Sequence, residues 1–355
     1  MKTISITATE EGTGKTAIAL ALGVIAQERG LDVGYMKPKG TRLQSHVGKV
    51  VDRDPLLATE LLGSDTELRS LEPIVYSSTF IENAVRGQED PEELRKQVRT
   101  TFEELADGRG LMLLEGADRL TTGGIIDLTD SQIAELLDAE VILVAGFEQL
   151  SDLDDHLAAI DAIGDQLAGV VFNRVGDAAL DRLEQDAIPF LESRGCPVVG
   201  VVPHQRDLAG VTVEELAAEL GGEQLTEGSP NAFVERFLVG AMSGGEALRY
   251  FRRTRNAAVI TGGDRSEIHT AAIEAPGIQC LIVTGGHRPS DTVLGKAKRA
   301  GLTVLVVTAD TLSTVERTEE IVHSGRTRDA ETVRRMRSLL EDHVDIDGIL
   351  GLGSS

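Results

Sequence analysis

The first residues of the chain change their hydrophobic pattern twice. Residues 3–8 alternate β-branched and small side chains, which is typical of a buried strand. The pattern breaks over residues 10–14, and apolar residues then return at helical spacing over residues 15–28. This stretch therefore predicts a strand, a loop of small residues and a helix that begins near Lys15.

The same alternation of strands and helices continues to residue 220. Apolar runs predict strands at residues 32–36, 111–114, 141–146, 168–173 and 197–202, and amphipathic patterns predict helices at residues 56–62, 91–105, 130–138, 151–163, 179–193 and 213–220. Continuous apolar strands between amphipathic helices indicate a parallel sheet with helices on both faces. Residues 64–91 show weak periodicity, and most of them receive no assignment.

A polar, glycine-rich stretch at residues 221–230 is predicted to be a linker. A helix is predicted to follow it, through Phe233, Phe237 and Leu238. Strands are then predicted at residues 257–261, 280–284 and 302–307, separated by helices and followed by two more helices. We therefore expect a larger α/β domain at residues 1–225 and a smaller α/β domain at residues 231–355.

Composition excludes several classes of protein. A chain of 355 residues with 41% hydrophobic and 26% charged residues is long enough for two globular domains. No apolar run reaches the roughly 18 residues of a membrane span, and no secretory leader is evident at the start. Cys196 and Cys280 are too few for a disulfide framework or a metal cluster and are expected to be core residues. We expect a cytoplasmic protein without membrane contact.

The net charge of −23 argues against binding to nucleic acid. Only eight of the 35 basic residues are lysines, and this acidic, arginine-rich composition suggests a halophilic protein from a high-salt cytoplasm. Residues 231–355 contain 16 acidic and 16 basic residues, so this half is neutral. We expect part of its surface to face a second copy of the chain, giving a homodimer or higher homo-oligomer. Two alternatives are drift in composition and an anionic ligand held by Arg252, Arg253, Arg255 or Arg265 near two Thr-Gly-Gly turns, at residues 261–263 and 284–286.

The loop before the first predicted helix has the chemistry of a phosphate site. Backbone N–H groups at a helix N-terminus attract anions, Lys15 adds a full positive charge, and the Thr16 hydroxyl can bind Mg²⁺. Thr9 stands where a strict Walker A motif has glycine. The alternative is an ordinary turn between a strand and a helix. The predicted nucleotide-binding residues of this loop are Gly12, Thr13, Gly14, Lys15, Thr16 and Ala17.

Further polar residues follow predicted strands, where open α/β sheets bind their ligands. Lys37 follows the second strand and is either a catalytic residue or a surface lysine. Asp52 and Asp54 precede a helix and either cap it or bind Mg²⁺. Glu115 ends an apolar run that resembles a Walker B strand. Two more strand ends from which a base could be read carry Asn173 and Pro203.

A Thr-Gly-Gly sequence occurs after two strands of the second predicted domain. Glycine permits positive φ or close approach of another group, so these turns are candidate ligand sites. The alternative is a pair of tight turns. The second-domain ligand candidates are Gly262, Gly263, Asp264, Arg265, Gly285 and Gly286.

Together these motifs resemble two known families. Residues Glu10–Thr16, Lys37-Pro38, Asp54, Glu115-Gly116-Ala117 and Asn173-Arg174 resemble dethiobiotin synthetases and related P-loop proteins. Residues from about 231 resemble a DRTGG domain, through Leu238–Met242, Ala258–Arg265, Thr284–Gly286 and Asp310–Leu312. This order of domains is similar to the N-terminal region of long phosphotransacetylases.

The resemblance implies roles for individual residues. Lys15 would be a catalytic residue that neutralises the β- and γ-phosphates of ATP, and Thr16, Asp54 and Glu115 would hold Mg²⁺. Lys37 would meet the substrate or the γ-phosphate, and Asn173 would recognise adenine. The chain departs from the synthetases at Glu10, where they have Asp, and at residues 118–120, where they keep glycine.

Three functions are therefore weighed. The first is an ATP-binding regulatory or assembly protein without an acetyltransferase domain. The second is an ATP- and Mg²⁺-dependent ligase of dethiobiotin synthetase type acting on an unknown substrate. The third is phosphate acetyltransferase, suggested by the family alone. ATP binding carries over from the resemblance better than dethiobiotin synthesis does, because residues 118–120 differ from the loop that shapes the synthetases' diamine site.

Overall fold

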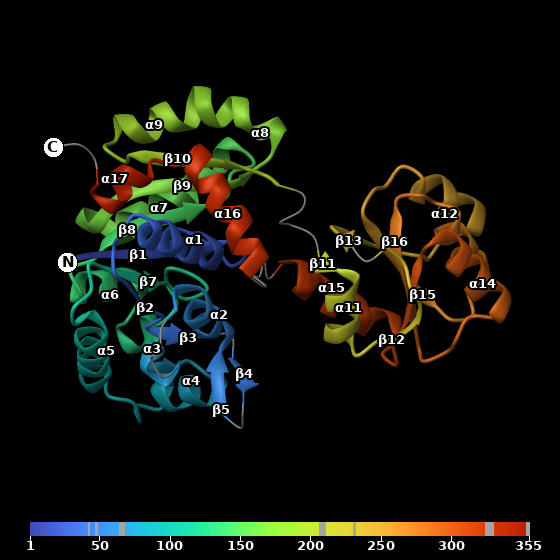
Figure 1. Cartoon of the computed structure of the whole chain (residues 1–355), viewed down its shortest axis with the longest axis horizontal. Coiled ribbons are helices and arrows are strands. Elements are labelled where there is room, and N and C mark those ends of the chain that lie inside the picture. The colour runs from blue at the N-terminus through green and yellow to red at the C-terminus, as the bar shows by residue number, and fades with distance from the viewer. Residues whose placement is uncertain are drawn as a thin grey trace. The chain divides into compact units, whose positions relative to one another are not determined.

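The computed structural model describes residues 1–41, 43–46, 49–63, 68–205, 211–229, 232–323 and 330–352. The chain divides into two compact units (Figure 1). Met1–His204 and Arg326–Ser355 form the first unit, and Gln205–Gly325 form the second. The second unit is therefore inserted into the sequence of the first.

A six-stranded parallel sheet forms the centre of the first unit, in the order β10-β9-β8-β1-β7-β2. Its strands are β1 (Lys2–Ala8), β2 (Val33–Met36), β7 (Leu111–Glu115), β8 (Glu140–Ala145), β9 (Leu167–Val175) and β10 (Val198–Pro203). The predicted parallel P-loop sheet is confirmed. Because all strands run the same way, their C-terminal ends share one edge, and the loop after β1 lies at the middle of that edge.

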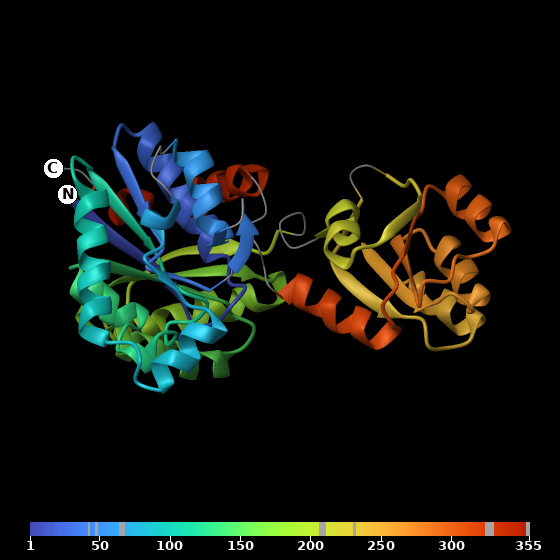
Figure 2. The ribbon, with the colours of Figure 1, turned by 90° about the horizontal axis from the view of Figure 1, so that it is seen from below.

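Helices cover both faces of this sheet (Figures 1 and 2). On one face α1 (Lys15–Glu28) lies beside α16 (Ala330–His343), which is followed by α17 (Ile346–Leu350). A continuous apolar core on the other face joins the sheet to α5 (Pro91–Ala106), α6 (Asp130–Leu136), α7 (Leu153–Ile163), α8 (Asp177–Arg182), a π-helical turn (Leu183–Ala187) and α9 (Ile188–Ser193). Short 3₁₀ turns occur at Gly124–Ile126, Leu150–Asp152 and Gly164–Gln166.

The chain between β2 and α5 forms several short elements. They are β3 (Lys39–Gly40), β4 (Leu43–His46), β5 (Lys49–Asp52), α2 (Arg53–Leu62), α3 (Leu68–Leu71), β6 (Ile74–Val75) and α4 (Ser78–Val85). Asp52 caps α2 by accepting a hydrogen bond from the Asp54 backbone N–H at 3.0 Å. β3 pairs with β6, and the Lys37 N–H donates to the Leu71 carbonyl at 2.8 Å. In the stretch with weak periodicity, residues 64–67 lie outside the described residues, and α3, β6 and α4 are the short elements of the rest. Contacts from α3 and β6 hold the segment after β2.

The second unit has a five-stranded sheet in the order β12-β17-β16-β15-β14. Its parallel strands are β14 (Arg236–Val239), β15 (Ala257–Gly262), β16 (Ile278–Thr284) and β17 (Thr303–Val306), and β12 (Glu223–Thr226) is antiparallel. One core packs this sheet against α12 (Gly244–Phe251), α13 (Ser266–Ile273) and α14 (Asp291–Ala300). The opposite core involves α11 (Val213–Leu220), α15 (Thr311–His323) and the pair β11 (Val211–Thr212) and β13 (Phe233–Val234) (Figure 2).

The predicted helix through Phe233, Phe237 and Leu238 is wrong, because the structure has β13 and β14 there. β14 pairs in parallel with β15, so its backbone hydrogen bonds go to a neighbouring strand. Phe237 packs against one core of the unit and the adjacent Leu238 against the other. Neighbouring side chains on opposite faces are the mark of a strand, and four residues are too few to distinguish this period from a helical one.

The predicted linker at residues 221–230 is also corrected. Within it, β12 forms an antiparallel edge of the second sheet through pairing with β17. The Thr226 hydroxyl is buried, donates to the Leu302 carbonyl at 2.7 Å and accepts from the Val304 N–H at 2.9 Å. These tertiary bonds stabilise a polar segment that reads as a loop. Residues 230 and 231, where the linker was predicted to end, lie outside the described residues.

The compact units differ from the predicted ranges 1–225 and 231–355 in two respects. Helix α11 lies in the second unit, while α16 and α17 pack on the first, where the Asp345 N–H donates to the Val199 carbonyl of β10 at 2.8 Å. The distribution of charge changes with the boundary. Residues 205–325 contain 16 acidic and 12 basic residues, a net charge of −4, and the remainder carries 42 acidic and 23 basic residues, a net charge of −19. The second unit is thus less acidic than the first but not neutral.

No helix among the described residues is long and apolar enough to cross a membrane. Cys196 and Cys280 are both buried free thiols that pack in apolar cores, as the composition predicted.

Candidate functional site

The loop between β1 and α1 has the backbone of an anion-binding turn. Gly12 and Gly14 adopt positive φ values of 80° and 90°, which only glycine takes without strain. Helix α1 begins directly afterwards at Lys15, and no side chain caps it at Gly14. Its N-terminal N–H groups therefore point at the edge of the sheet, where a phosphate would be stabilised.

Asn173 lies against this loop from β9, which is separated from β1 by β8 in the sheet. Its Nδ2 donates to the Thr13 carbonyl at 2.7 Å, and its own Oδ1 accepts from the Arg174 N–H at 2.9 Å. A Cβ on Gly14 would lie 2.5 Å from Asn173 Nδ2, so this contact requires glycine there. The predicted adenine-recognising residue is thus placed where it supports the P-loop backbone. Pro203 ends β10 at the same edge of the sheet.

Thr16 and Glu115 meet across the first turn of α1. The Thr16 hydroxyl donates to Glu115 Oε1 at 2.5 Å, and the Tyr35 hydroxyl donates to Glu115 Oε2 at 2.7 Å. All three side chains are buried. The Glu115 carboxylate at the end of β7 therefore accepts hydrogen bonds from both α1 and β2.

Lys37 extends the same cluster. Its Nζ lies 3.1 Å from Asp52 Oδ2 and 3.8 Å from Glu115 Oε1, and it donates a hydrogen bond to Asp54 Oδ2. Lys37, Asp52 and Asp54 are each buried, with at most 3% exposure. Lys37 is therefore not a surface lysine. Asp52 caps α2, which is one of the two roles predicted for it.

Burial controls the protonation of this cluster. Burial raises the pKa of Glu115 to about 7, and the nearby Asp54 carboxylate acts in the same direction, whereas Lys37 and the hydrogen bonds from Thr16 and Tyr35 lower it. Burial likewise raises the pKa of Glu72 to about 7, although the Asp52 N–H donates to its Oε2 at 2.8 Å. Both pKa shifts follow from the small exposure of these side chains, which is 1% for Glu115 and 4% for Glu72.

The donors present fit Mg²⁺ chemistry. Thr16, Asp54 and Glu115, predicted as its ligands, are hard oxygen donors, and all three are buried around Lys37 or bonded to one another. No group of three or more His, Cys, Asp or Glu side chains in the part of the chain that the structure describes is arranged to hold a metal by itself. Mg²⁺ is usually bound by one or two carboxylates supplemented by ligand phosphates and water.

The loop after Glu115 reaches back to the P-loop. Lys15 is 5% exposed, and its Nζ donates to the Asp118 carbonyl at 3.2 Å. Asp118 Oδ1 accepts from the Thr41 hydroxyl at 2.9 Å. Asp118, one of the residues at which the chain departs from the synthetase pattern, therefore lies next to the P-loop lysine.

Several residues of the cluster were missed by the sequence motifs. Tyr35 and Lys39 occupy alternate positions with Lys37, a spacing of two that could have suggested a shared direction. Glu72 and Asp130 come from segments without a motif. Lys39 Nζ lies 3.0 Å from Asp130 Oδ1, and burial lowers the pKa of this lysine while Asp130 opposes the shift.

The ligand candidates of the second unit divide between two edges of its sheet. Gly262 to Arg265 follow β15, Gly285 and Gly286 follow β16 with φ of 80° and 70°, and the hydroxyls of Thr284 and Thr311 lie 2.8 Å apart beside them. Arg265 donates to the Met242 carbonyl at 3.0 Å at this same edge. The expectation that Arg252, Arg253 and Arg255 lie near these turns is wrong, because they precede β15, and the N-terminal ends of parallel strands form the opposite edge.

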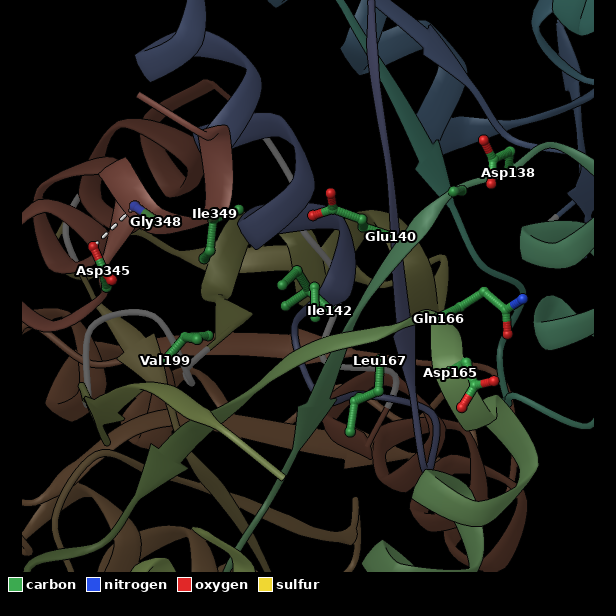
Figure 3. Close-up of a pocket in the computed structure, with 12 residues that line it drawn as sticks. Asp138, Glu140, Ile142, Asp165, Gln166, Leu167, Val199, Asp345, Gly348 and Ile349 are labelled. Carbon is green, nitrogen blue, oxygen red and sulfur yellow. Dashed lines mark hydrogen bonds between the residues drawn. The ribbon is translucent and has the colours of Figure 1, made fainter. Parts of the chain in front are cut away.

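A pocket of about 600 Å³ lies at the opposite edge of the first sheet (Figure 3). Its lining includes Glu140 and Leu167, the first residues of β8 and β9, together with Asp345 and Ile349 from the C-terminal segment. Figure 3 shows several carboxylates around it. Because the P-loop follows the C-terminal end of β1, this pocket is separate from the phosphate site.

Two family models together cover most of the chain. The model described as "AAA domain" matches residues 2–212, which is more than half of the chain. An ATP-dependent dethiobiotin synthetase of Frankia casuarinae is 33% identical over 181 residues, covering 48% of this chain and 71% of that protein. The chain belongs to this AAA domain family. In this AAA domain protein, a DRTGG domain matches residues 215–321, and the expected combination of domains is confirmed.

Two further relatives show how far the similarity of this AAA domain protein extends. A phosphate acetyltransferase of Pseudomonas putida is 25% identical over 365 residues, covering 97% of this chain and 51% of that protein. A dethiobiotin synthetase of Methanococcus vannielii is 24% identical over 208 residues, covering 58% of this chain and 94% of that protein. The chain thus spans about half the length of the phosphate acetyltransferases it matches.

Proposed function

We propose that the chain binds Mg-ATP at its P-loop and uses this binding as a regulatory or assembly signal. One observation carries the proposal: Lys15 and Thr16 stand at the uncapped N-terminus of α1, and Thr16 is bonded to Glu115 at the end of the adjacent strand β7. Similarity to only about half the length of phosphate acetyltransferases supports the regulatory or assembly role.

Each residue of the cluster has a proposed part in binding. The loop N–H groups and Lys15 would hold the phosphates, and Lys15 would exchange the Asp118 carbonyl for a phosphate oxygen. Thr16, Asp54 and Glu115 would hold Mg²⁺, which neutralises phosphate charge when bound. Lys37, beside Asp54 and Glu115, would meet the γ-phosphate or a second substrate.

Titration calorimetry with Mg-ATP in molar KCl tests the proposal. We expect saturable binding to the wild type and none to Lys15→Ala, with both proteins folded by circular dichroism. Lys2→Ala is the matched control, because Lys2 lies at the other end of β1, paired with Glu140 at 2.8 Å. Equal affinity in wild type and Lys15→Ala would refute the P-loop as the site.

A ligase of dethiobiotin synthetase type is the second candidate. The observation that favours it is the burial of Lys37 among three carboxylates at the strand ends, where it can act as an electrostatic clamp on transferred phosphate. A metabolite screen for stimulated ADP release distinguishes the two, because only a ligase requires a second substrate. Acetyl transfer from acetyl-CoA to phosphate, the activity named for the longer relatives, is the third candidate and is tested by CoA release.

We also propose an anionic ligand, nucleotide-like in chemistry, at the turns Gly262–Arg265 and Gly285-Gly286 of the second unit. Two observations support this ligand. The neighbouring strands β15 and β16 both end in glycine turns, and the first turn carries the positively charged Arg265. Self-association of the chain, as a homodimer or higher homo-oligomer, is a further proposal, supported by the lower negative charge of the second unit (−4) than of the rest of the chain (−19). A high-salt cytoplasm as its compartment is a proposal supported by the acidic, arginine-rich composition.

A further inference from the structure

Lys39 is enclosed by polar partners deep in the first unit, with 1% exposure. Its Nζ lies 3.0 Å from Asp130 Oδ1 and donates to the Thr122 carbonyl at 2.7 Å and to the Leu128 carbonyl. An ammonium group has three donors, so this set satisfies all of them. Because burying an unpaired ammonium is costly, the ion pair and both carbonyls are needed for Lys39 to occupy this position.

Asp130 also accepts hydrogen bonds from the strand before the P-loop and from the turn after β7. Its Oδ2 accepts from the Thr7 hydroxyl at 2.6 Å, and its Oδ1 accepts from the Ala117 N–H at 3.2 Å. Thr7 is in β1 just before the P-loop, and Ala117 is two residues beyond Glu115. A single buried carboxylate therefore joins Lys39, the central strand and the turn that follows Glu115.

Two glycines show how closely the segment 116–130 fits around this pair. A Cβ on Gly116 would lie 2.1 Å from Asp130 Oδ2. Gly123 has φ of 95°, and a Cβ there would lie 2.3 Å from the Leu128 carbonyl oxygen and 3.0 Å from Lys39 Nζ. Neither position can hold a larger residue without moving the ion pair.

The same segment contacts the P-loop directly. The Asp118 carbonyl accepts from Lys15, and the Leu120 N–H donates to the Ala8 carbonyl at 3.0 Å. We infer that Lys39 and Asp130 are positioning residues of the nucleotide site, which hold segment 116–130 in place beside Lys15 and Glu115. The link to nucleotide affinity rests on the proposed ATP binding, whereas the holding of the segment does not.

Two variants separate positioning from stability. Lys39→Met leaves Asp130 buried without its cation, whereas Lys39→Met combined with Asp130→Asn removes both charges and keeps a hydrogen-bonding group at position 130. Lys2→Met is the matched control, since it breaks a half-exposed ion pair in the same sheet. For each protein we would measure the melting temperature, calorimetric affinity for Mg-ATP and hydrogen exchange of residues 116–130.

We expect Lys39→Met to lose stability and the double variant to regain most of it, because no unpaired charge remains. The affinity for Mg-ATP should stay at least tenfold weaker in the double variant, with faster amide exchange in segment 116–130, because the segment must be ordered on binding. Lys2→Met should match the wild type in affinity and in exchange of that segment.

The double variant decides the inference even if Lys39→Met does not fold. Wild-type or tighter affinity, or unchanged exchange of segment 116–130, in the folded double variant would overturn it. If the wild type itself binds no Mg-ATP, the proposed function fails. In that event faster exchange in the double variant alone would still support the holding of the segment, and unchanged exchange would refute it.

Discussion

Arg337 of α16 binds Glu28 at the end of α1, with Nη2 and Nε at 2.8 and 2.9 Å from Glu28 Oε2. These residues come from opposite ends of the chain. Arg29 and Asp347 form a second ion pair beside them. The segment that follows the inserted second unit thus covers the helix whose first residue is the P-loop lysine, so the first unit includes residues from both ends of the chain.

Helix α16 should contribute to the stability of the first unit. Leu340 is 1% exposed, and Leu340→Ala is expected to lower the free energy of unfolding by about 2–5 kcal/mol through the cavity it leaves. Urea denaturation of the full chain measures this. Arg335→Ala, on the exposed side of the same helix, should change it by about 0.5 kcal/mol or less. Similar midpoints for wild type and Leu340→Ala would show that α16 does not stabilise this unit.

Asn173→Ala should weaken the binding of ATP and of GTP to the same extent. The Asn173 side chain donates to the Thr13 carbonyl, and without it a buried acceptor of the P-loop loses its partner, which costs about 1–3 kcal/mol. Calorimetry with both nucleotides measures the ratio. A selective loss of ATP would instead favour the adenine-recognising role expected from the family.

Glu72 should make the chain more stable in mild acid. Burial raises the pKa of Glu72 from 4.5 to about 7, so over that range the folded protein holds a proton that the unfolded chain has released. Its contribution is complete below pH about 4.5 and is lost as the pH rises through 7. Glu72→Gln, which keeps an acceptor for the Asp52 N–H, should remove up to roughly 3 kcal/mol of this pH dependence.

Urea unfolding between pH 4.5 and 7.5 gives the change in the free energy of unfolding with pH for each variant. The readout is the difference between wild type and variant, because other groups such as Glu115 also titrate there. Glu103→Gln, on the exposed side of α5, is the control and should keep the wild-type slope. Parallel pH profiles for wild type and Glu72→Gln would contradict the raised pKa.

We expect the full chain to associate in molar KCl, with a molar mass at least twice the monomer mass of 37.9 kDa. High salt is needed because it screens the repulsion between copies that each carry a net charge of −23. Light scattering over a range of concentrations measures this. Tyr250, which is 52% exposed on α12 of the second unit, gives a probe: Tyr250→Glu should weaken association. Val85→Glu, at a 72% exposed position on α4 of the first unit, should not. A monomer mass at every concentration would rule out the dimer.

Local pattern was sufficient to predict the elements that repeat along the chain. The strand before Glu10, the glycine loop to Thr16, the helix from Lys15 and the apolar strand ending in Glu115 were all predicted from their residues and are present in the structure. Such elements are readable because burial on both faces imposes a continuous apolar run on each strand and a 3.6-residue period on each helix. Parallel strands then bring their C-terminal ends together, so Lys37, Glu115 and Asn173 could be assigned to one edge of the sheet.

The partners of those residues were decided only by the tertiary structure. Nothing in the sequence pairs Lys39 with Asp130 or Glu72 with Asp52, because these contacts join distant segments and leave no periodic signal. Likewise, Arg236–Val239 is a strand because β15 supplies its hydrogen bonds, and α16 returns to the first unit because its apolar face packs beside α1. A short or amphipathic segment specifies which face must be buried, and the rest of the fold decides what buries it.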